Sequence, residues 1–469
     1  MLCSKILSWI AFHGVSAPAR HNASRKIPPA ASHGSRLHQS RPLCLCRRDL
    51  RDIQDVLQHP DCWEADAVNC RCCGSDRLEL VLDLHRQPWG NDFVPQSEEG
   101  RSALYPLELF FCHDCTMVQI GYTVPKETMF VDHRYVSGTT KSLTRHFEEV
   151  RDRILDRVAF RAGDYVLDVG GNDGTFLSTF LPKNVPVLNV DSGRLQAQLS
   201  EKAGVPCLND FFNETTALRV REERGPARVI HGSGVFFHLE ELHSAFAGIK
   251  KLLADDGMVV AEFIYLPGMV RSCAFDQIYH EHLVYYTVQS FDALLRRHGL
   301  EITDAELVPI HGGSCIAYIS HAGSRPKTEA LQRIVADEVE GGFDTVEVYR
   351  DFARRTEALR DTVRRLIGEA HAQGQRIQAL GAPVKGSTIM NYCGFDETQF
   401  ECAVEINELK CGTWFPGTRI PVRHQNAVEP PDLYFMLSWN FKDEILAKLT
   451  DFRAKGGKVL IPVPEPHIV

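Results

Sequence analysis

One short stretch of the chain gathers several titratable side chains. In Phe275-Asp-Gln-Ile-Tyr279-His280-Glu281-His282, the last four residues place a phenol, two imidazoles and a carboxylate side by side. A neutral imidazole can remove a proton near neutral pH, a carboxylate can orient it, and a phenol can donate to a developing oxyanion. The stretch lacks the i,i+4 histidine spacing of a zinc-protease helix, so it favours acid–base chemistry over metal ligation. The alternative is the polar start of a helix, with Glu281 near its first turn.

Two further side chains stand alone in the sequence. His238, in Val-Phe-Phe-His-Leu, follows a predicted strand and would face the same cleft, although a satisfied core histidine explains it equally well. Tyr135, in His-Arg-Tyr-Val-Ser-Gly, is by itself an ordinary packing residue.

A glycine-rich turn follows the predicted strand Tyr165–Val169. In Asp168-Val-Gly170-Gly-Asn172-Asp-Gly174, the glycines at 170 and 174 permit a sharp turn and a close approach to a ligand. The spacing differs from the dinucleotide fingerprint G-x-G-x-x-G, and Asn172 replaces the usual middle glycine. Asp168 can receive the amino group of a methionine moiety, whereas a pyrophosphate would prefer bare N–H groups. The turn therefore favours S-adenosylmethionine (SAM).

Acids at the ends of the next two α/β units extend this pattern. Asp191 can accept hydrogen bonds from a ribose diol. Asp210 can accept from the exocyclic amine of adenine, with Phe211 packing on the ring. The ordered acids strengthen the prediction of a SAM site; the alternative is a glycine-rich turn of another α/β enzyme.

Paired cysteines predict a metal site near the N-terminal end of the fold. Cys70 and Cys73 form one C-x2-C pair, and Cys112 and Cys115 form a second one. Four thiolates satisfy the tetrahedral preference of Zn(II) and leave no open position, so we expect a structural zinc. The alternative is a set of reduced, buried cysteines, and the neighbouring Cys72 and His113 could be confused with ligands. Cys62 is left out of the site.

Alternating strand and helix signals surround the glycine-rich turn. Such alternation predicts an α/β fold with a parallel, doubly wound sheet, whose ligands lie beyond the C-terminal strand ends. The predicted strands are Val166–Val169, Val187–Val190, Val229–Ile230 and Met258–Phe263, and the predicted helices are Leu177–Leu181, Leu195–Ala203 and Leu242–Leu253.

A second α/β section closes the chain. Its strand Ile377–Leu380 is followed by the turn Gly381–Ser387, where Lys385, Ser387 and the backbone N–H groups of a helix start can hold a diphosphate. A structural lobe with a solvent-facing Lys385 is the alternative. We expect a zinc-binding domain at 69–122, a class I SAM-binding Rossmann-like domain at 141–320 and a Rossmann-like C-terminal domain at 327–469. Helical stretches are expected at Lys141–Phe160 and at about Lys327–Gln373.

Composition excludes several functions. The 469 residues carry a net charge of −9, so nucleic acid is a poor candidate partner. No apolar run reaches about 18 residues, so we expect no membrane-spanning helix. The 15 cysteines are odd in number and suit a reducing, cytoplasmic setting. Residues 1–60 are predicted to be a disordered or transit-like extension, since no acid occurs up to Arg48; a misplaced start codon is the alternative.

Taken together, these features resemble the zinc-containing sugar C-methyltransferase family, whose members act on nucleotide-linked deoxysugars. The resemblance spans nearly all of the chain from Cys70 to Val469. The matching segments are Arg86-Gln-Pro, Tyr135, Asp168, Gly170, Asn172-Asp173-Gly174, Phe275–Tyr279, Glu281-His282, His311-Gly-Gly313, Gly381–Ser387, Asn391–Gly394, Lys410, Pro416–Val422, Trp439-Asn440 and Val463–His467.

The resemblance implies a role for each candidate. His282 would remove the proton beside a ketone, Tyr279 and Glu281 would support the enolate and orient the substrate, and Tyr135 and His238 would assist. His280 stands where many members carry an acid. The implied activity resembles that of an NDP-hexose 3-C-methyltransferase, with SAM as donor, a structural zinc and a small nucleotide-sugar substrate, typically a TDP-linked keto sugar.

Two other function classes stay open at this point. One is a SAM-dependent methyltransferase of a different small-molecule acceptor, and the other is a non-catalytic SAM-binding scaffold. Tyr279, Glu281 and His282 together speak against a scaffold.

Overall fold

The computed structural model describes residues 68–97, 102–131, 135–139 and 141–469. Cys62 and the predicted N-terminal extension lie outside these residues. The description below concerns the unit Ala65–Val469.

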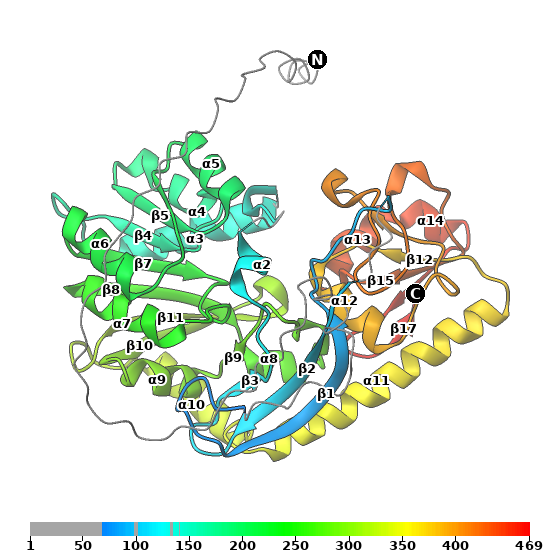
Figure 1. The fold of residues 1–469 in the computed structure, drawn as a ribbon, viewed down its shortest axis with the longest axis horizontal. Helices are drawn as coiled ribbons and strands as arrows, with labels where there is room; N and C mark the ends of the chain where they lie inside the picture. Colours follow the sequence, from blue (N-terminus) through cyan, green and yellow to red (C-terminus); the bar gives the residue numbers. More distant parts are fainter. Residues whose placement is uncertain (1–67, 98–101, 132–134, 140) are drawn as a thin grey trace, which may run out of the picture. The chain divides into compact units, whose positions relative to one another are not determined.

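The middle section of the chain forms a seven-stranded sheet, in the order β10-β11-β8-β7-β4-β5-β6 (Figure 1). The five strands from β8 to β6 run parallel, as predicted. The strands are β4 (Val166–Val169), β5 (Val187–Asp191), β6 (Cys207–Asn209), β7 (Ala227–Ser233), β8 (Leu253–Ile264), β10 (Leu300–Val308) and β11 (Ser314–His321).

The edge formed by β10 and β11 is not parallel. The two strands pair antiparallel with each other, and β11 pairs antiparallel with β8. A hairpin connection as short as Pro309–Gly313 leaves no room for a crossover helix, so a parallel pairing is impossible there. The prediction of a parallel sheet therefore holds for its centre only.

Helices cover both faces of this sheet, which makes it doubly wound. Val166 of β4 packs in the core beneath α3 and α4, whereas the next residue, Leu167, packs in the core beneath α6 and α7. Successive strand side chains point to opposite faces, so each face needs its own helical layer. The helices of this section are α2 (Lys126–Phe130), α3 (Lys141–Arg157), α4 (Thr175–Ser178), α5 (Arg194–Lys202), α6 (Glu214–Arg224), α7 (Leu242–Leu252), α8 (Leu266–Arg271) and α9 (Val288–Arg296).

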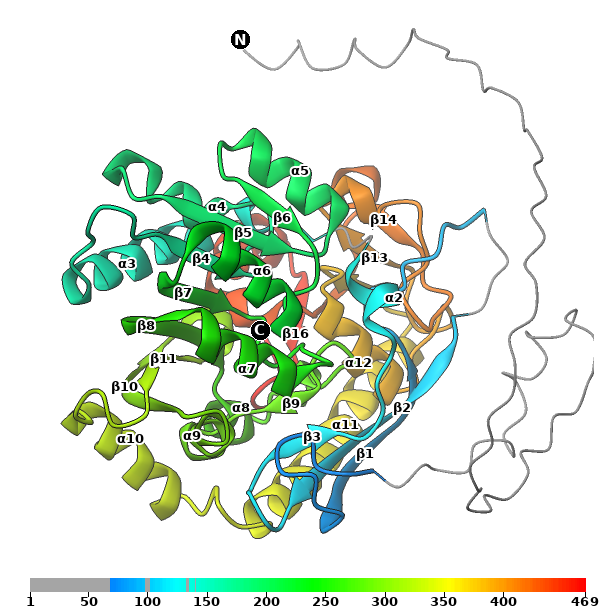
Figure 2. The same cartoon turned by 60° about the vertical axis from the view of Figure 1, so that its left-hand side comes forward.

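The cysteine section forms a four-stranded antiparallel sheet, β1-β2-β3-β9. Its strands are β1 (Leu78–Pro88), β2 (Leu104–Cys112), β3 (Val118–Ile120) and β9 (Val284–Tyr285). The fourth strand comes from the central section, directly after the titratable stretch. In both views β1 lies beside the long helix α11 (Glu347–Ala372), which it contacts (Figures 1 and 2).

The C-terminal section has a six-stranded sheet, β14-β13-β12-β15-β16-β17, in which β17 alone pairs antiparallel. The strand order reverses between β12 and β15, the point where such sheets bind ligands. The elements are β12 (Ile377–Leu380), α12 (Val384–Tyr392), β13 (Cys402–Glu405), β14 (Val422–His424), β15 (Leu433–Met436), α13 (Lys442–Lys448), α14 (Thr450–Ala454), β16 (Lys458–Ile461) and β17 (His467–Ile468).

The predicted helical segment before this sheet is two helices, α10 (Glu329–Glu340) and α11 (Glu347–Ala372). They are separated at Gly341-Gly342, where Gly342 has a φ of 72° that a helix does not allow. Among the described residues, no helix combines the length and apolar character needed to cross a membrane.

Candidate active site

The glycine-rich turn leaves β4 at the C-terminal edge of the parallel strands. Gly170 and Gly174 have φ of 64° and 76°, a region that favours glycine. A Cβ atom at Gly170 would lie 2.8 Å from Cγ2 of Val235, and one at Gly174 would lie 2.8 Å from Oγ of Ser200. Both positions therefore require glycine.

Two buried carboxylates flank this turn. Oδ1 of Asp168 lies 2.7 Å from Nδ1 of His231 on the neighbouring strand β7. Asp191 accepts from the backbone N–H groups of Asn172 and Gly193 at 2.9 and 2.8 Å. Burial raises the pKa of Asp191 to about 6. The turn has no room for side chains at its two glycines, and two acids lie beside it. This arrangement fits a ligand with an amino group and a diol, as SAM has.

Asn172 does more than replace a glycine. Its φ of 52° is one that asparagine tolerates better than most residues. Its Oδ1 accepts from the backbone N–H of Ser137 at 3.0 Å, and its Nδ2 donates to the carbonyl of Tyr135 at 3.3 Å. The side chain thereby ties the Tyr135 segment to the turn, a function that the sequence pattern did not reveal.

Asn172→Gly is expected to weaken SAM binding about tenfold, because the turn keeps its φ but loses hydrogen bonds worth about 1 to 1.5 kcal/mol. Titration calorimetry with SAM measures this change. Asn184→Gly is the matched control, since Asn184 also has a positive φ of 56° but lies outside the turn. Equal SAM affinity in the two variants would show that the Tyr135 tie is irrelevant to the cofactor.

The predicted adenine residues lie at the surface. Oδ2 of Asp210 is 3.0 Å from Arg219, and both side chains are exposed. The Nζ atom of Lys126 lies 4.7 Å from the ring centroid of Phe211. Asp210 and Phe211 therefore already have partners that an adenine would have to displace or share.

Aromatic contacts bring three of the predicted catalytic side chains together. The ring of His282 lies 3.9 Å from that of Tyr279 and 5.1 Å from that of His238. Nδ1 of His282 lies 2.8 Å from the carbonyl oxygen of Gln277, which can only accept, so Nδ1 carries the proton. This tautomer places the lone pair on Nε2, as a general base requires.

The two tyrosines of the site, Tyr279 and Tyr135, lie in different surroundings. Burial raises the pKa of Tyr279 well above its usual value, so the phenol keeps its proton and can donate it in a hydrogen bond. Tyr135 is 54% exposed at the edge of the cofactor turn, held through its backbone carbonyl.

Glu281 is held by residues that no motif had singled out. Its side chain is buried, and Oε1 accepts from Nε1 of Trp89 at 2.9 Å and from Nδ2 of Asn91 at 2.6 Å. Burial raises the pKa of Glu281, while these two donors oppose the rise. The alternative interpretation, a polar helix start with Glu281 near its first turn, is wrong: the stretch follows a short 3-10 turn, Phe275–Gln277, and forms a loop before β9.

His280 belongs to the core rather than to the reacting group. It is fully buried, its Nε2 lies 3.2 Å from the carbonyl of Pro106, and burial lowers its pKa to about 4. His280 is therefore neutral at physiological pH and anchors the loop.

Lys385 lies in the interior, beside the titratable stretch. Its Nζ is 3.8 Å from Oδ2 of Asp276 and 4.2 Å from the ring centroid of Trp439, whose Nε1 also donates to Asp276 at 2.6 Å. Burial lowers the pKa of Lys385, and the Asp276 carboxyl limits the fall. The alternative of a solvent-facing Lys385 is wrong. Ser387 is also buried, and its Oγ accepts from Asn391 at 3.2 Å.

The four predicted metal ligands come together. One ligand atom from each of Cys70, Cys73, Cys112 and Cys115 lies within 4.8 Å of the others. The sulfur–sulfur distances of 3.5 and 3.6 Å are close to the edges of a tetrahedron around zinc. His113 instead contacts Glu79 at 3.0 Å, so the ambiguity over His113 is resolved. The cysteines therefore fit a closed zinc site.

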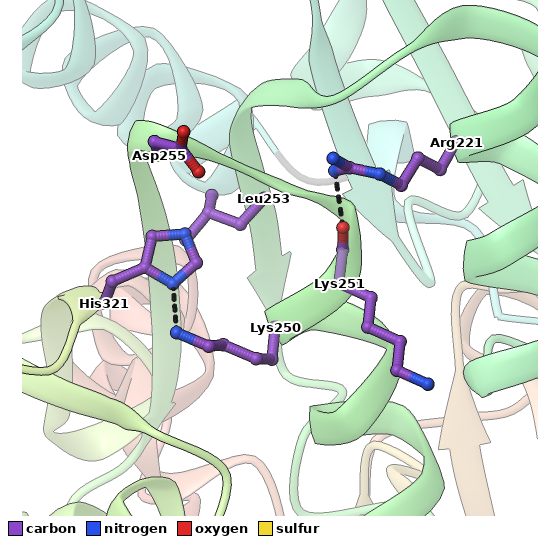
Figure 3. Close-up of a pocket in the computed structure, with 6 residues that line it drawn as sticks. All are labelled: Arg221, Lys250, Lys251, Leu253, Asp255 and His321. Atoms are coloured by element: carbon purple, nitrogen blue, oxygen red, sulfur yellow. Dashed lines mark hydrogen bonds between the residues drawn. The ribbon is translucent and has the colours of Figure 1, made fainter.

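A shallow pocket at the opposite edge of the central sheet is unrelated to these residues (Figure 3). Lys250 contacts Nδ1 of His321 at 2.6 Å, and Arg221 donates to the carbonyl of Lys251. The pocket lies where β8 begins, whereas the cofactor turn lies where β4 ends. It has no part in the site.

Three family models match consecutive parts of the chain. A zinc-binding domain matches residues 70–130, a methyltransferase domain matches 143–305, and a C-methyltransferase C-terminal domain matches 309–464. The C-methyltransferase NovU of Streptomyces niveus is 30% identical over 421 residues, which cover 89% of this chain and 99% of NovU.

Solved structures resemble a smaller part of the chain. A SAM-dependent methyltransferase from Anabaena variabilis is 16% identical and covers 38% of this chain and 85% of its own, with a TM-score of 0.31. The CcbJ methyltransferase from Streptomyces caelestis is 13% identical and covers 38% and 90%, with a TM-score of 0.29.

Proposed function

The chain belongs to the C-methyltransferase family, and from that premise we propose that it methylates the carbon next to the ketone of a nucleotide-linked keto-deoxysugar. The protein is a SAM-dependent C-methyltransferase with a structural zinc. The finer assignment rests above all on one observation, the pairing of His282 with Tyr279. A base with its lone pair on Nε2 and a protonated phenol lie in ring contact.

The first step that we propose is removal of the proton alpha to the ketone by Nε2 of His282. The electron pair of the broken C–H bond moves toward the carbonyl oxygen. Tyr279, kept protonated by burial, donates a hydrogen bond to that oxygen as it gains charge. Without this stabilisation, an imidazole is too weak a base for a carbon acid in water.

The second step forms the carbon–carbon bond. When bound, SAM supplies an electrophilic methyl group whose transfer leaves a neutral thioether. The chain's own part is to hold the enolate carbon in line with that methyl group. Glu281 is fixed by Trp89 and Asn91 and is proposed to orient the sugar, with Tyr135 and His238 as auxiliary residues.

The cofactor contacts are proposed to follow the order of the strands. Asp168 would receive the amino group, Asp191 the ribose diol, and Asp210 with Phe211 the adenine, above the turn formed by Gly170, Asn172 and Gly174. The zinc takes no chemical part, because four thiolates leave it no open position.

The nucleotide is proposed to bind at the C-terminal section. Support comes from the reversal of strand order between β12 and β15 and from the start of α12 beside it. Lys385 and Ser387 are the proposed substrate contacts there. Lys385 contacts Asp276, which belongs to the same stretch as the proposed catalytic residues Tyr279 and His282. Lys385 would therefore meet the substrate near the reacting sugar.

A panel of acceptors tests this function. We expect methyl transfer from SAM to a TDP-linked 4-keto sugar, with much lower kcat/KM for the same sugar without its nucleotide. Transfer to an oxygen or carboxylate acceptor instead would establish a different methyltransferase. SAM binding without turnover on any acceptor would support a scaffold.

A further inference from the structure

The zinc-binding domain holds the loop Tyr279–His282, which carries the proposed catalytic residues and is called the catalytic loop below. The carboxylate of Glu281 accepts two hydrogen bonds through Oε1, from Nε1 of Trp89 at 2.9 Å and from Nδ2 of Asn91 at 2.6 Å. Both donors directly follow β1. Resting on the role proposed above for Glu281, we propose that Trp89 and Asn91 are positioning residues of the reaction, which hold this carboxylate toward the substrate.

The segment Trp89–Asn91 is itself fixed in position. A Cβ atom at Gly90 would lie 2.7 Å from Cγ2 and 3.2 Å from the carbonyl oxygen of Val384, the first residue of α12. The backbone can approach α12 this closely only because residue 90 is glycine. The backbone that carries the N–H donors of Trp89 and Asn91 is therefore packed closely against α12 of the C-terminal section.

The next residues strengthen that anchor. The ring of Phe93 packs edge-on against Phe415 at a centroid distance of 5.9 Å, and Nζ of Lys410 lies 4.5 Å from the centroid of the Phe93 ring. The carbonyl of Val94 accepts from the backbone N–H of Trp414 at 2.8 Å. A donor carried by such a fixed segment loses little conformational entropy when it binds Glu281.

The loop on both sides of Glu281 is also bound to the zinc-binding domain. His280 contacts the carbonyl of Pro106 at 3.2 Å, and the carbonyl of Leu283 accepts from Ile120 at 3.0 Å. Beyond it, β9 pairs with β3. The zinc-binding domain thus supports the loop at its backbone and Glu281 at its carboxylate.

Electrostatics give this role a measurable signature. Two N–H donors on one oxygen favour the charged carboxylate, so they lower the pKa of Glu281 against the effect of burial. Two other titratable groups interact with Glu281. Lys410 also lowers the pKa of Glu281, and Glu281 in turn raises the pKa of Tyr279. Removing the donors must therefore raise the pKa of Glu281.

Trp89→Phe and Asn91→Leu test the proposal. Trp89→Phe keeps an aromatic ring, Asn91→Leu nearly keeps the size of the side chain, and each removes the donor. With a TDP-linked 4-keto sugar as acceptor, each variant is expected to lower kcat about 10- to 100-fold. The acid limb of the pH–kcat profile requires both a neutral His282 and a charged Glu281, so the part of it set by Glu281 should move to higher pH by on the order of one unit. The KM for SAM and the zinc content should not change.

Two controls separate the possible failures. Trp414→Phe makes the same exchange at a tryptophan that contacts Val94 only through its backbone N–H, which the variant keeps, and whose ring contacts Arg419. It should leave kcat and the profile unchanged. If Glu281→Gln is inactive while the Trp89 and Asn91 variants keep the kcat and acid limb of the unmodified protein, the positioning role is wrong and the proposed function stands. If Glu281→Gln is fully active, the role of Glu281 is wrong, and this inference falls with it.

Discussion

His282→Ala is expected to abolish methyl transfer, lowering kcat by at least about 10²- to 10⁴-fold, while SAM binding persists. The imidazole is the one proposed proton acceptor, and its tautomer is set by the carbonyl of Gln277. An alanine leaves the cofactor turn untouched, since that turn is built from β4 and its neighbours. Stopped-flow or end-point methyl transfer, together with calorimetric titration of SAM, measures both quantities.

A second readout locates the loss at proton removal. In D₂O, the unmodified protein should exchange the proton alpha to the ketone for deuterium, and His282→Ala should not. His243→Ala is the matched control, because His243 is exposed and pairs with His298 on the surface. Full activity in His282→Ala would refute its assignment as the base.

Cys112→Ser is expected to release the zinc and to destabilise the protein severely. Cys112 is fully buried, and its sulfur lies 3.6 Å from that of Cys73. Structural zinc contributes about 10–16 kcal/mol of apparent binding free energy in isolated zinc-finger peptides. Even a loss of several kcal/mol would lower the unfolding midpoint by on the order of 10 °C. Metal analysis and thermal unfolding measure the two effects.

The matched control for this prediction is Cys72→Ser. Cys72 is as buried as Cys112 and adjoins Cys73, but it is not one of the four clustered ligands. We expect Cys72→Ser to retain one zinc per chain and Cys112→Ser to retain none. Full zinc content in Cys112→Ser would show that the ligand set is wrong.

The sequence predicted the parts of the fold that local pattern determines. Buried parallel strands are near-continuous apolar runs, so β4 and β5 were located almost to the residue. The antiparallel edge was missed because β10 and β11 carry no signal of strand direction. The two-residue strand β9 was missed because it completes a sheet whose other strands lie far earlier in the chain.

At the site, too, the sequence revealed what local spacing determines and missed what contacts between distant residues determine. Regular spacing revealed the four cysteines, and the structure brings their sulfurs together. No pattern could link Glu281 to Asn91, because 190 residues separate them and each alone is an ordinary polar residue. The contact of Lys385 with Asp276 is likewise a product of tertiary packing, and burial then changes the pKa of Lys385.

The location of the transferred methyl group tests the proposed chemistry most directly. The protein is incubated with a TDP-linked 4-keto sugar and SAM carrying a ¹³C-labelled methyl group, and the product is examined by NMR. We predict that the label is bonded to the ring carbon next to the ketone and shows long-range couplings to the neighbouring ring protons. A label bonded to oxygen, or a methyl group on a carbon that is not adjacent to the ketone, would contradict the enolate mechanism.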